Sequence, residues 1–191
     1  MLSLPAALVL AQVCAAPADP TTLLSVVAVE SRFEPWAIGV NGSPAKSLHP
    51  TSREAAEALA RQLLAQGRNL DLGLGQINHR NLSRLGLTLE DAFDPCRNLA
   101  AAQAVLAANG ETVATPDAWR RALSRYNTGG PTRGLANGYV AKVTRAAAEI
   151  GPQVRALRDG LAGDAPRAAS APARPDFVIV PRPLSATGDL P

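Results

Sequence analysis

Three helix-start signatures recur along the chain, and they constrain its fold more than any other feature of the sequence. Asp19-Pro20, Asp94-Pro95 and Thr115-Pro116 each place a capping side chain directly before a proline. The capping oxygen accepts free N–H groups of a first helical turn, and proline, which has no N–H, suits the position after the cap. We therefore expect helices over residues 20–33, 95–108 and 116–126.

Apolar side chains at helical spacing predict two more long helices. One begins with a capping box formed by Thr51 and Glu54 and ends at Gly67. The other spans residues 138–150 and is stopped by Gly151-Pro152. Shorter helical turns are expected from Asn78 to Gly86 and, capped by Thr88, as far as Phe93.

Two stretches of the sequence do not have a helical pattern. Residues 36–50 are rich in Gly, Asn, Ser and Pro, which predicts an irregular loop. Residues 70–75 alternate leucine with Asp or Gly, a period of two that indicates a short extended or hairpin segment. With 47% hydrophobic but only 4% aromatic residues, the chain suits helices packed by Ala and Leu, so the expected fold class is all-α.

Both ends of the chain differ from this central pattern. Residues 1–16 form an apolar run that is either a secretory signal or the first helix of the fold; the absence of a preceding Lys or Arg favours the helix. The run is too short to span a membrane. Seven of the sixteen prolines lie in residues 152–191, which predicts a disordered tail after a folded domain of residues 1–151. Within the tail, residues 176–183 (DFVIVPRP) are either a strand-addition motif for a partner or, as we favour, an apolar remnant without a role.

Charge and metal-ligand content narrow the range of functions. The net charge is only +3 and the arginines are scattered, so nothing indicates nucleic-acid binding. The only histidines are His49 and His79 and no HExxH motif occurs, so we expect no metal. The residues alone leave Cys14 and Cys96 as either buried free thiols or one disulfide, which would indicate an oxidising compartment.

Glu30 is the most informative single residue. It follows Leu23, Val26 and Val27 at intervals of seven, four and three residues, which places its carboxyl group on an apolar helix face. Burial there raises a carboxyl pKa toward neutrality, as a general acid requires. The ordinary alternative is a carboxylate at the border of the apolar face, paired with Arg32 or another arginine.

Three further segments carry polar groups at the ends of elements. They are residues 73–78 (GLGQIN), 122–130 (ALSRYNTGG) and 137–143 (NGYVAKV). Amides and phenols near a buried acid would form a cleft suited to sugar hydroxyl and N-acetyl groups. Each has a plainer alternative, such as a helix cap at Asn78 or a core aromatic at Tyr126.

Taken in order, Glu30-Ser31, GLGQIN, ALSRYNTG and the triplet at residues 138–140 resemble the motifs of the family-1 lytic transglycosylases. The similarity is greatest to the specialised transglycosylases of type IV secretion and conjugation systems, and it covers residues 4–150. The resemblance implies a lysozyme-like fold, with Glu30 as the catalytic acid/base and Ser31 supporting it. It further implies substrate contacts from a set of cleft residues and a disulfide: Gln76, Asn78, Tyr126, Asn127 and Tyr139 in the cleft, and Cys14 bonded to Cys96.

The same resemblance implies peptidoglycan strands as substrate, no cofactor, a periplasmic location and secretion components as partners of the tail. A clear export signal is missing from the sequence. Two alternatives stay open: a hydrolysing muramidase in which Asp71 activates water, and a non-catalytic glycan-binding scaffold of a secretion machine.

Overall fold

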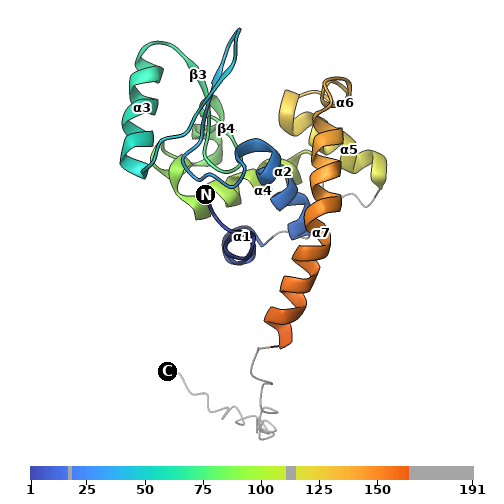
Figure 1. Cartoon of the computed structure of the whole chain (residues 1–191). Coiled ribbons are helices and arrows are strands. Elements are labelled where there is room, and N and C mark those ends of the chain that lie inside the picture. Colours follow the sequence, from blue (N-terminus) through green and yellow to red (C-terminus); the bar gives the residue numbers. More distant parts are fainter. Residues whose placement is uncertain (17–18, 111–114, 164–191) are drawn as a thin grey trace, which may run out of the picture.

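The computed structural model describes residues 1–16, 19–110 and 115–163. These residues form a mostly helical protein with one small antiparallel sheet (Figure 1), which confirms the expected fold class. The helices are α1 (Leu4–Leu10), α2 (Pro20–Ser31), α3 (Arg53–Ala65), α4 (Pro95–Ala108), α5 (Pro116–Thr128), α6 (Arg133–Ala136) and α7 (Tyr139–Gly163). The strands are β1 (Ile38–Asn41), β2 (Lys46–Leu48), β3 (Asn69–Leu72) and β4 (Ile77–Asn78).

The three cap-and-proline signatures all begin helices where the sequence predicts them. Asp19 accepts from the N–H groups of Thr21 and Thr22, and the caps of α4 and α5 each accept one backbone N–H in the same way. α2 ends at Ser31, two residues earlier than expected, because Arg32 and Phe33 adopt left-handed backbone angles with φ of 53° and 63°. The two shorter predictions are also confirmed as 3-10 turns: His79–Asn81 and Ser83–Leu85 follow the Asn78 cap, and Asp91–Phe93 follows Thr88.

The N-terminal run is part of the folded domain. α1 continues into a π-helical turn, Ala11–Ala15, and Ala7, Leu8 and Ala11 are fully buried in the core. Cys14, in that turn, is disulfide-bonded to Cys96 in α4, with Cα atoms 5.2 Å apart. Within the described residues no single helix is long and apolar enough to cross a membrane; Leu4–Ala15 and Pro20–Ser31 would meet that test only as a sharply bent pair.

The sheet has the strand order β2-β1-β3-β4, with every pair antiparallel. β3 and β4 form the hairpin expected near residues 70–75. The prediction of an irregular loop over residues 36–50 is wrong, because β1 and β2 lie there. Ile38 and Val40 of β1 are buried in the core and pair with Leu72 and Leu70 of β3. This burial and pairing make the segment a strand, although its Gly and Asn content is typical of a loop.

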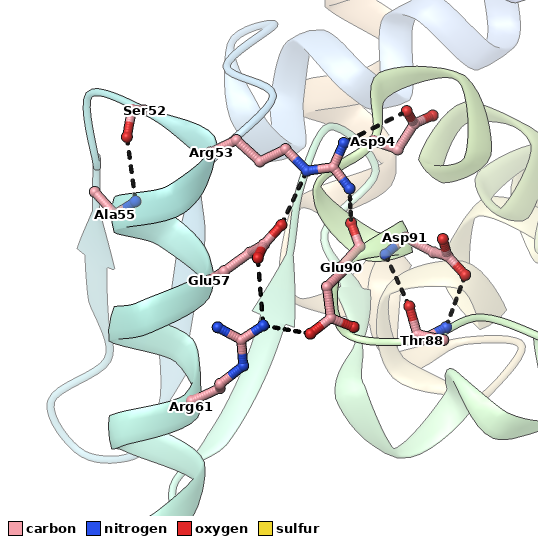
Figure 2. Close-up of polar contacts among 9 residues, drawn as sticks. All are labelled: Ser52, Arg53, Ala55, Glu57, Arg61, Thr88, Glu90, Asp91 and Asp94. Carbon is pink, nitrogen blue, oxygen red and sulfur yellow. Dashed lines mark hydrogen bonds and ion pairs between the residues drawn. The ribbon is translucent and has the colours of Figure 1, made fainter.

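An ion-pair network joins α3 to the segment just before α4 (Figure 2). Arg53 donates to Glu57 at 2.9 Å and to the Glu90 carbonyl at 3.0 Å, and Arg61 bridges the carboxylates of Glu57 and Glu90. The cap of α3 is Ser52, whose hydroxyl accepts from the Ala55 N–H, so the assignment of the cap to Thr51 is wrong by one residue.

α7 is longer than the sequence predicts, because Pro152 lies inside it and does not end it. Val154 is fully buried beyond the proline, and Leu157 packs against the same core. This packing offsets the roughly 3 kcal/mol by which an interior proline disfavours a helix. The expectation of a disordered tail is therefore wrong for residues 152–163, and residues 164–191, with their apolar island, lie outside the described residues. Figure 1 shows α7 running alongside α2 and then projecting away from the rest of the protein.

Candidate active site

A cleft of about 420 Å³ lies where the sheet, α2, α4 and α5 meet. Its walls are mostly amide and charged side chains, the chemistry that hydrogen-bonds a polyhydroxylated ligand. The lining residues are Glu30, Asn41, Asn69, Asp71, Gln76, Ile77, Asn78, Asn81, Arg84, Val105, Asn109, Arg125, Tyr126, Asn127 and Gly129.

Glu30 lies in the last turn of α2, half-buried, with its carboxyl group facing the cleft. The Tyr139 hydroxyl donates to its Oε1 at 2.6 Å. Burial raises the pKa of Glu30 to about 7, the tyrosine hydrogen bond opposes this rise, and the charge of Asp71 adds to it. Leu23, Val26 and Val27 are fully buried below it, so the apolar helix face expected from the sequence is present. A carboxyl group that is half protonated near pH 7 is able both to donate and to accept a proton.

The alternative of an ion pair between Glu30 and Arg32 is not found, since no ion pair joins the two side chains in the described part of the chain. Arg32 is exposed and already belongs to the left-handed turn after the helix.

A second cavity of about 230 Å³ also reaches Glu30 and Gln76. Ser31 lines it, and its buried hydroxyl donates to the Val27 carbonyl at 3.2 Å within α2. Both cavities are lined by Glu30 and Gln76, so the carboxyl group of Glu30 is accessible from each of them.

Gln76 ends the tight turn between β3 and β4, in a left-handed conformation with φ of 48°. Its Nε2 donates to the carbonyls of Gly73 and Ala37, at 2.9 and 3.2 Å. Its Oε1 lies over Gly39, where an added Cβ would approach it to 2.7 Å. Both amide donors are thus used by the protein, and the carbonyl oxygen of Gln76 is the group left to face a ligand.

Tyr126 and Asn98 hold this turn from the α5 and α4 sides. The Tyr126 hydroxyl donates to the Gly75 carbonyl at 2.6 Å, and burial together with the nearby charges of Glu30 and Asp71 raises the tyrosine pKa well above its usual value. Asn98, fully buried, accepts from Gly75 N–H at 2.7 Å and donates to the carbonyls of Leu72 and Ala92. A Cβ on Gly75 would lie 2.7 Å from the Ala102 side chain and 2.9 Å from the Tyr126 hydroxyl, so this position requires glycine.

Asp71 and Asn78 are joined on the cleft face of the sheet. Asn78 donates to Asp71 Oδ1 at 2.7 Å and to Asn69 at 2.9 Å, while Asn41 donates to Asp71 Oδ2 at 2.8 Å. The side-chain Oδ1 of Asn78 accepts from the Arg80 N–H and caps the following turn, as the helix-cap alternative expected. Its amide donors hold Asp71, which stands in the cleft as a second carboxylate.

Asn127 contributes to the cleft and to the placement of Tyr139. Its Oδ1 accepts from the Asn137 Nδ2 at 2.9 Å, and the Asn137 Oδ1 accepts from the Tyr139 N–H at 3.0 Å, which fixes the first residue of α7. The structure therefore brings all seven sequence-predicted site residues around the two cavities or into direct contact with Glu30: Glu30, Ser31, Gln76, Asn78, Tyr126, Asn127 and Tyr139.

Asn98 and Asn41 are two of the site residues that were not predicted from the sequence, and Arg84 and Arg125 in the cleft lining are two more. Asn98 had one usable signal, because asparagine is a poor helix interior residue unless its side chain has a specific partner. Asn41 had none, since its segment was predicted as a loop. No group of three or more His, Cys, Asp or Glu side chains within residues 1–16, 19–110 and 115–163 is arranged to hold a metal ion.

Comparison with known proteins identifies the family of the chain. The model of the Transglycosylase SLT domain family matches residues 8–147. Protein virB1 of Agrobacterium fabrum is 41% identical over 150 residues, covering 76% of this chain and 61% of the relative. Protein virB1 of Rhizobium radiobacter is 44% identical over 146 residues, covering 74% and 61%.

The type IV secretion system protein virB1 of Brucella abortus is 41% identical over 116 residues, covering 61% of this chain and 44% of the relative. The chain thus spans less than two thirds of the length of these curated relatives. No solved structure matches it significantly. Because the family model covers well over half of its residues, the chain belongs to the SLT transglycosylase domain family.

Proposed function

We propose that the chain is a peptidoglycan lytic transglycosylase with Glu30 as its single acid/base. The observation that carries the proposal is a carboxyl group with a pKa of about 7, hydrogen-bonded by Tyr139, at the junction of two polar cavities. The chain would cut the β-1,4 bond between N-acetylmuramic acid and N-acetylglucosamine.

The reaction proceeds in two proton transfers. Protonated Glu30 donates to the glycosidic oxygen as the bond to the anomeric carbon of the muramyl residue breaks, and the substrate N-acetyl carbonyl stabilises the oxocarbenium-like centre. Ionised Glu30 then removes the proton of the 6-hydroxyl, whose oxygen attacks that carbon and closes a 1,6-anhydro ring. No water is consumed, and assistance of this kind contributes about 10²–10⁴-fold to the rate.

The relatives named as type IV secretion system proteins support a proposal on where this activity is used. We propose that the chain acts in the periplasm, where the Cys14–Cys96 disulfide is stable, and opens the wall locally for a type IV secretion apparatus. Residues after the catalytic domain would contact that apparatus.

A hydrolysing muramidase is the second candidate, because Asp71 supplies another carboxylate in the cleft. Hydrolysis would need a water molecule activated by this second group. Each carboxylate oxygen of Asp71 already accepts one amide N–H, from Asn78 and from Asn41. These bonds hold the side chain in place, which supports a role in raising the pKa of Glu30 over a role in activating water.

Mass spectrometry of digested sacculi separates the two reactions. We expect muropeptides that end in 1,6-anhydro-muramic acid, each one water lighter than its hydrolysed counterpart. Products with a reducing muramyl end would instead establish hydrolysis, and absence of any soluble product would indicate a glycan-binding scaffold.

The Tyr139→Phe variant tests the acid role of Glu30 through pH. The acid must be protonated, so the rate of the wild-type protein should fall as the pH rises through about 7. The tyrosine hydrogen bond lowers the pKa of Glu30, so its removal should move this decline to higher pH. The measurement is a pH profile of wall solubilisation, with Tyr126→Phe as control because that hydroxyl bonds to Gly75 rather than to Glu30. A decline that stays in place in Tyr139→Phe would show that another group controls it.

A further inference from the structure

Asn137 lies outside the lining of both cavities around Glu30, yet it contacts two of the residues that form the site. It is the residue after α6, and its side chain uses both ends of the amide. Its Nδ2 donates to the Asn127 Oδ1 at 2.9 Å, and its Oδ1 accepts from the Tyr139 N–H at 3.0 Å. One exposed side chain therefore joins the wall of the larger cleft to the residue whose hydroxyl bonds to Glu30.

The connection between α5 and α7 gives the backbone of Asn137 a fixed position. The buried Ser124 hydroxyl of α5 accepts from the Gly134 N–H of α6 at 2.9 Å. A Cβ on Gly134 would lie 2.7 Å from the Ser124 Cα, so α6 packs directly against α5. Asn137 then donates its own N–H to the Arg133 carbonyl at 3.0 Å. These bonds hold Asn137 against the helix that carries Asn127.

Tyr139 is the first residue of α7, so the position of its backbone is set at a helix end. The N–H of a first helical residue has no acceptor within its own helix, and the Asn137 side chain supplies that acceptor here. Tyr139 is buried, and its hydroxyl donates to the Glu30 Oε1 at 2.6 Å. A displacement of the first turn of α7 would therefore lengthen the hydrogen bond to the acid.

We propose that Asn137 is a positioning residue, which holds the Tyr139 hydroxyl against Glu30 by tying the start of α7 to Asn127. This inference rests on the proposed role of Glu30, and it adds a residue that acts on the acid only through Tyr139. A plain helix cap would need only the Oδ1 of Asn137. The second hydrogen bond, from Nδ2 to the cleft wall, distinguishes positioning from capping.

The expected consequence is a change in the ionisation of Glu30. The Tyr139 hydrogen bond lowers the pKa of Glu30, so a weaker bond raises that pKa. Because Asn137→Ala replaces one neutral side chain by another, it leaves the charges near the acid unchanged. Among the described residues, the other ionisable side chains that line the two cavities with Glu30 are Asp71, Arg84, Arg125 and Tyr126 in the larger one and Arg32 and His49 in the smaller one.

The experiment measures the titration of Glu30 in the full chain by carboxyl carbon-13 NMR, with its resonance assigned by its loss in Glu30→Gln. We expect the midpoint to rise by about one pH unit in Tyr139→Phe and by about half a unit in Asn137→Ala, where the displaced hydroxyl keeps part of its bond. The combined variant should titrate like Tyr139→Phe alone. An unchanged midpoint in Asn137→Ala, or a rise that persists undiminished in the Tyr139→Phe background, would overturn the proposal.

Two further variants separate positioning from helix capping. Asn137→Ser keeps an oxygen that is able to accept the Tyr139 N–H but has no amide to reach Asn127, so its midpoint should rise as in Asn137→Ala. A wild-type midpoint in Asn137→Ser would reduce Asn137 to a cap and contradict the positioning role. Ser52→Ala is the matched control, because it removes the cap of α3 outside the cleft lining. It should lower the urea midpoint of unfolding and leave the Glu30 titration in place; a shifted titration would show that loss of stability alone produces the effect, against the proposal.

The pH profile of wall solubilisation connects this titration to the proposed reaction. Its decline above neutral pH should move to higher pH in Asn137→Ala by the same interval as the midpoint of Glu30. If the wild-type protein releases no muropeptides while the Asn137 substitutions still move that midpoint, the lytic function fails and the positioning role stands. If the wild-type protein is active and the midpoint does not move, the positioning role fails and the lytic function stands.

Discussion

Glu30→Gln is expected to lower the rate of wall cleavage by at least about 100-fold, because an amide at this position cannot donate a proton to the glycosidic oxygen. The glutamine side chain has the same shape and still accepts the Tyr139 hydroxyl, so the cleft keeps its geometry. The measurement is release of soluble muropeptides from purified sacculi. Glu149→Gln, an exposed acid of α7, is the matched control and should retain full activity.

The same variant should be more stable than the wild-type protein above neutral pH. The pKa of Glu30 is raised from 4.5 to about 7 in the folded state, so between these values the folded protein holds a proton that the unfolded chain has lost. The free energy of unfolding therefore falls as the pH rises through this window, by at most about 3 kcal/mol. Glutamine does not titrate, and urea unfolding at pH 5 and pH 8 should show a weaker decline in Glu30→Gln. Near-normal cleavage by a variant with this stability would remove Glu30 from the mechanism.

Asn98→Asp is expected to destabilise the protein by about 3–5 kcal/mol, although the two side chains have nearly the same size. The asparagine donates two hydrogen bonds, to the carbonyls of Leu72 and Ala92, and an ionised aspartate would face both oxygens without a proton to offer. The Gly75 N–H would keep its acceptor, but the turn that carries Gln76 would lose its anchor on α4. The measurement is urea unfolding combined with wall-cleavage activity below the unfolding transition.

Asn109→Asp gives the comparison for this change. Asn109 caps the C-terminal end of the same helix and is only half-buried, so a negative charge there should reduce stability by no more than about 1 kcal/mol. Equal stability of the Asn98→Asp and Asn109→Asp proteins would show that the buried amide does not anchor the turn.

The parts of the fold that the sequence predicts correctly are those determined by interactions between residues close together in the chain. The caps at Asp19, Asp94 and Thr115 act within one helical turn, so their effect can be read from neighbouring residues. The strand β1 could not be found in this way, because Ile38 and Val40 are held by β3, about thirty residues further along the chain. Pro152 was misread for the same reason: the burial of Val154 outweighs the local preference of proline to end a helix.

In the candidate site, too, local features could be predicted from the sequence and long-range contacts could not. The position of Glu30 on an apolar helix face follows from spacing alone, and the structure bears out the burial expected of it. Its contact with Tyr139 spans 109 residues of sequence, and only the family resemblance placed these two side chains together. The support that Asn98 gives to the Gly75 turn depends on packing between α4 and β3, which neither spacing nor resemblance indicated.

The unbroken course of α7 also separates two ends of the protein. Tyr139 begins the helix beside the cleft that Glu30 lines, and Gly163 ends it 24 residues later, which at 1.5 Å per residue is about 36 Å. The helix therefore carries its own C-terminal end well clear of the cleft. Under the proposed function, a partner bound at the Gly163 end of α7 and a glycan strand bound at Glu30 would be too far apart to compete for space.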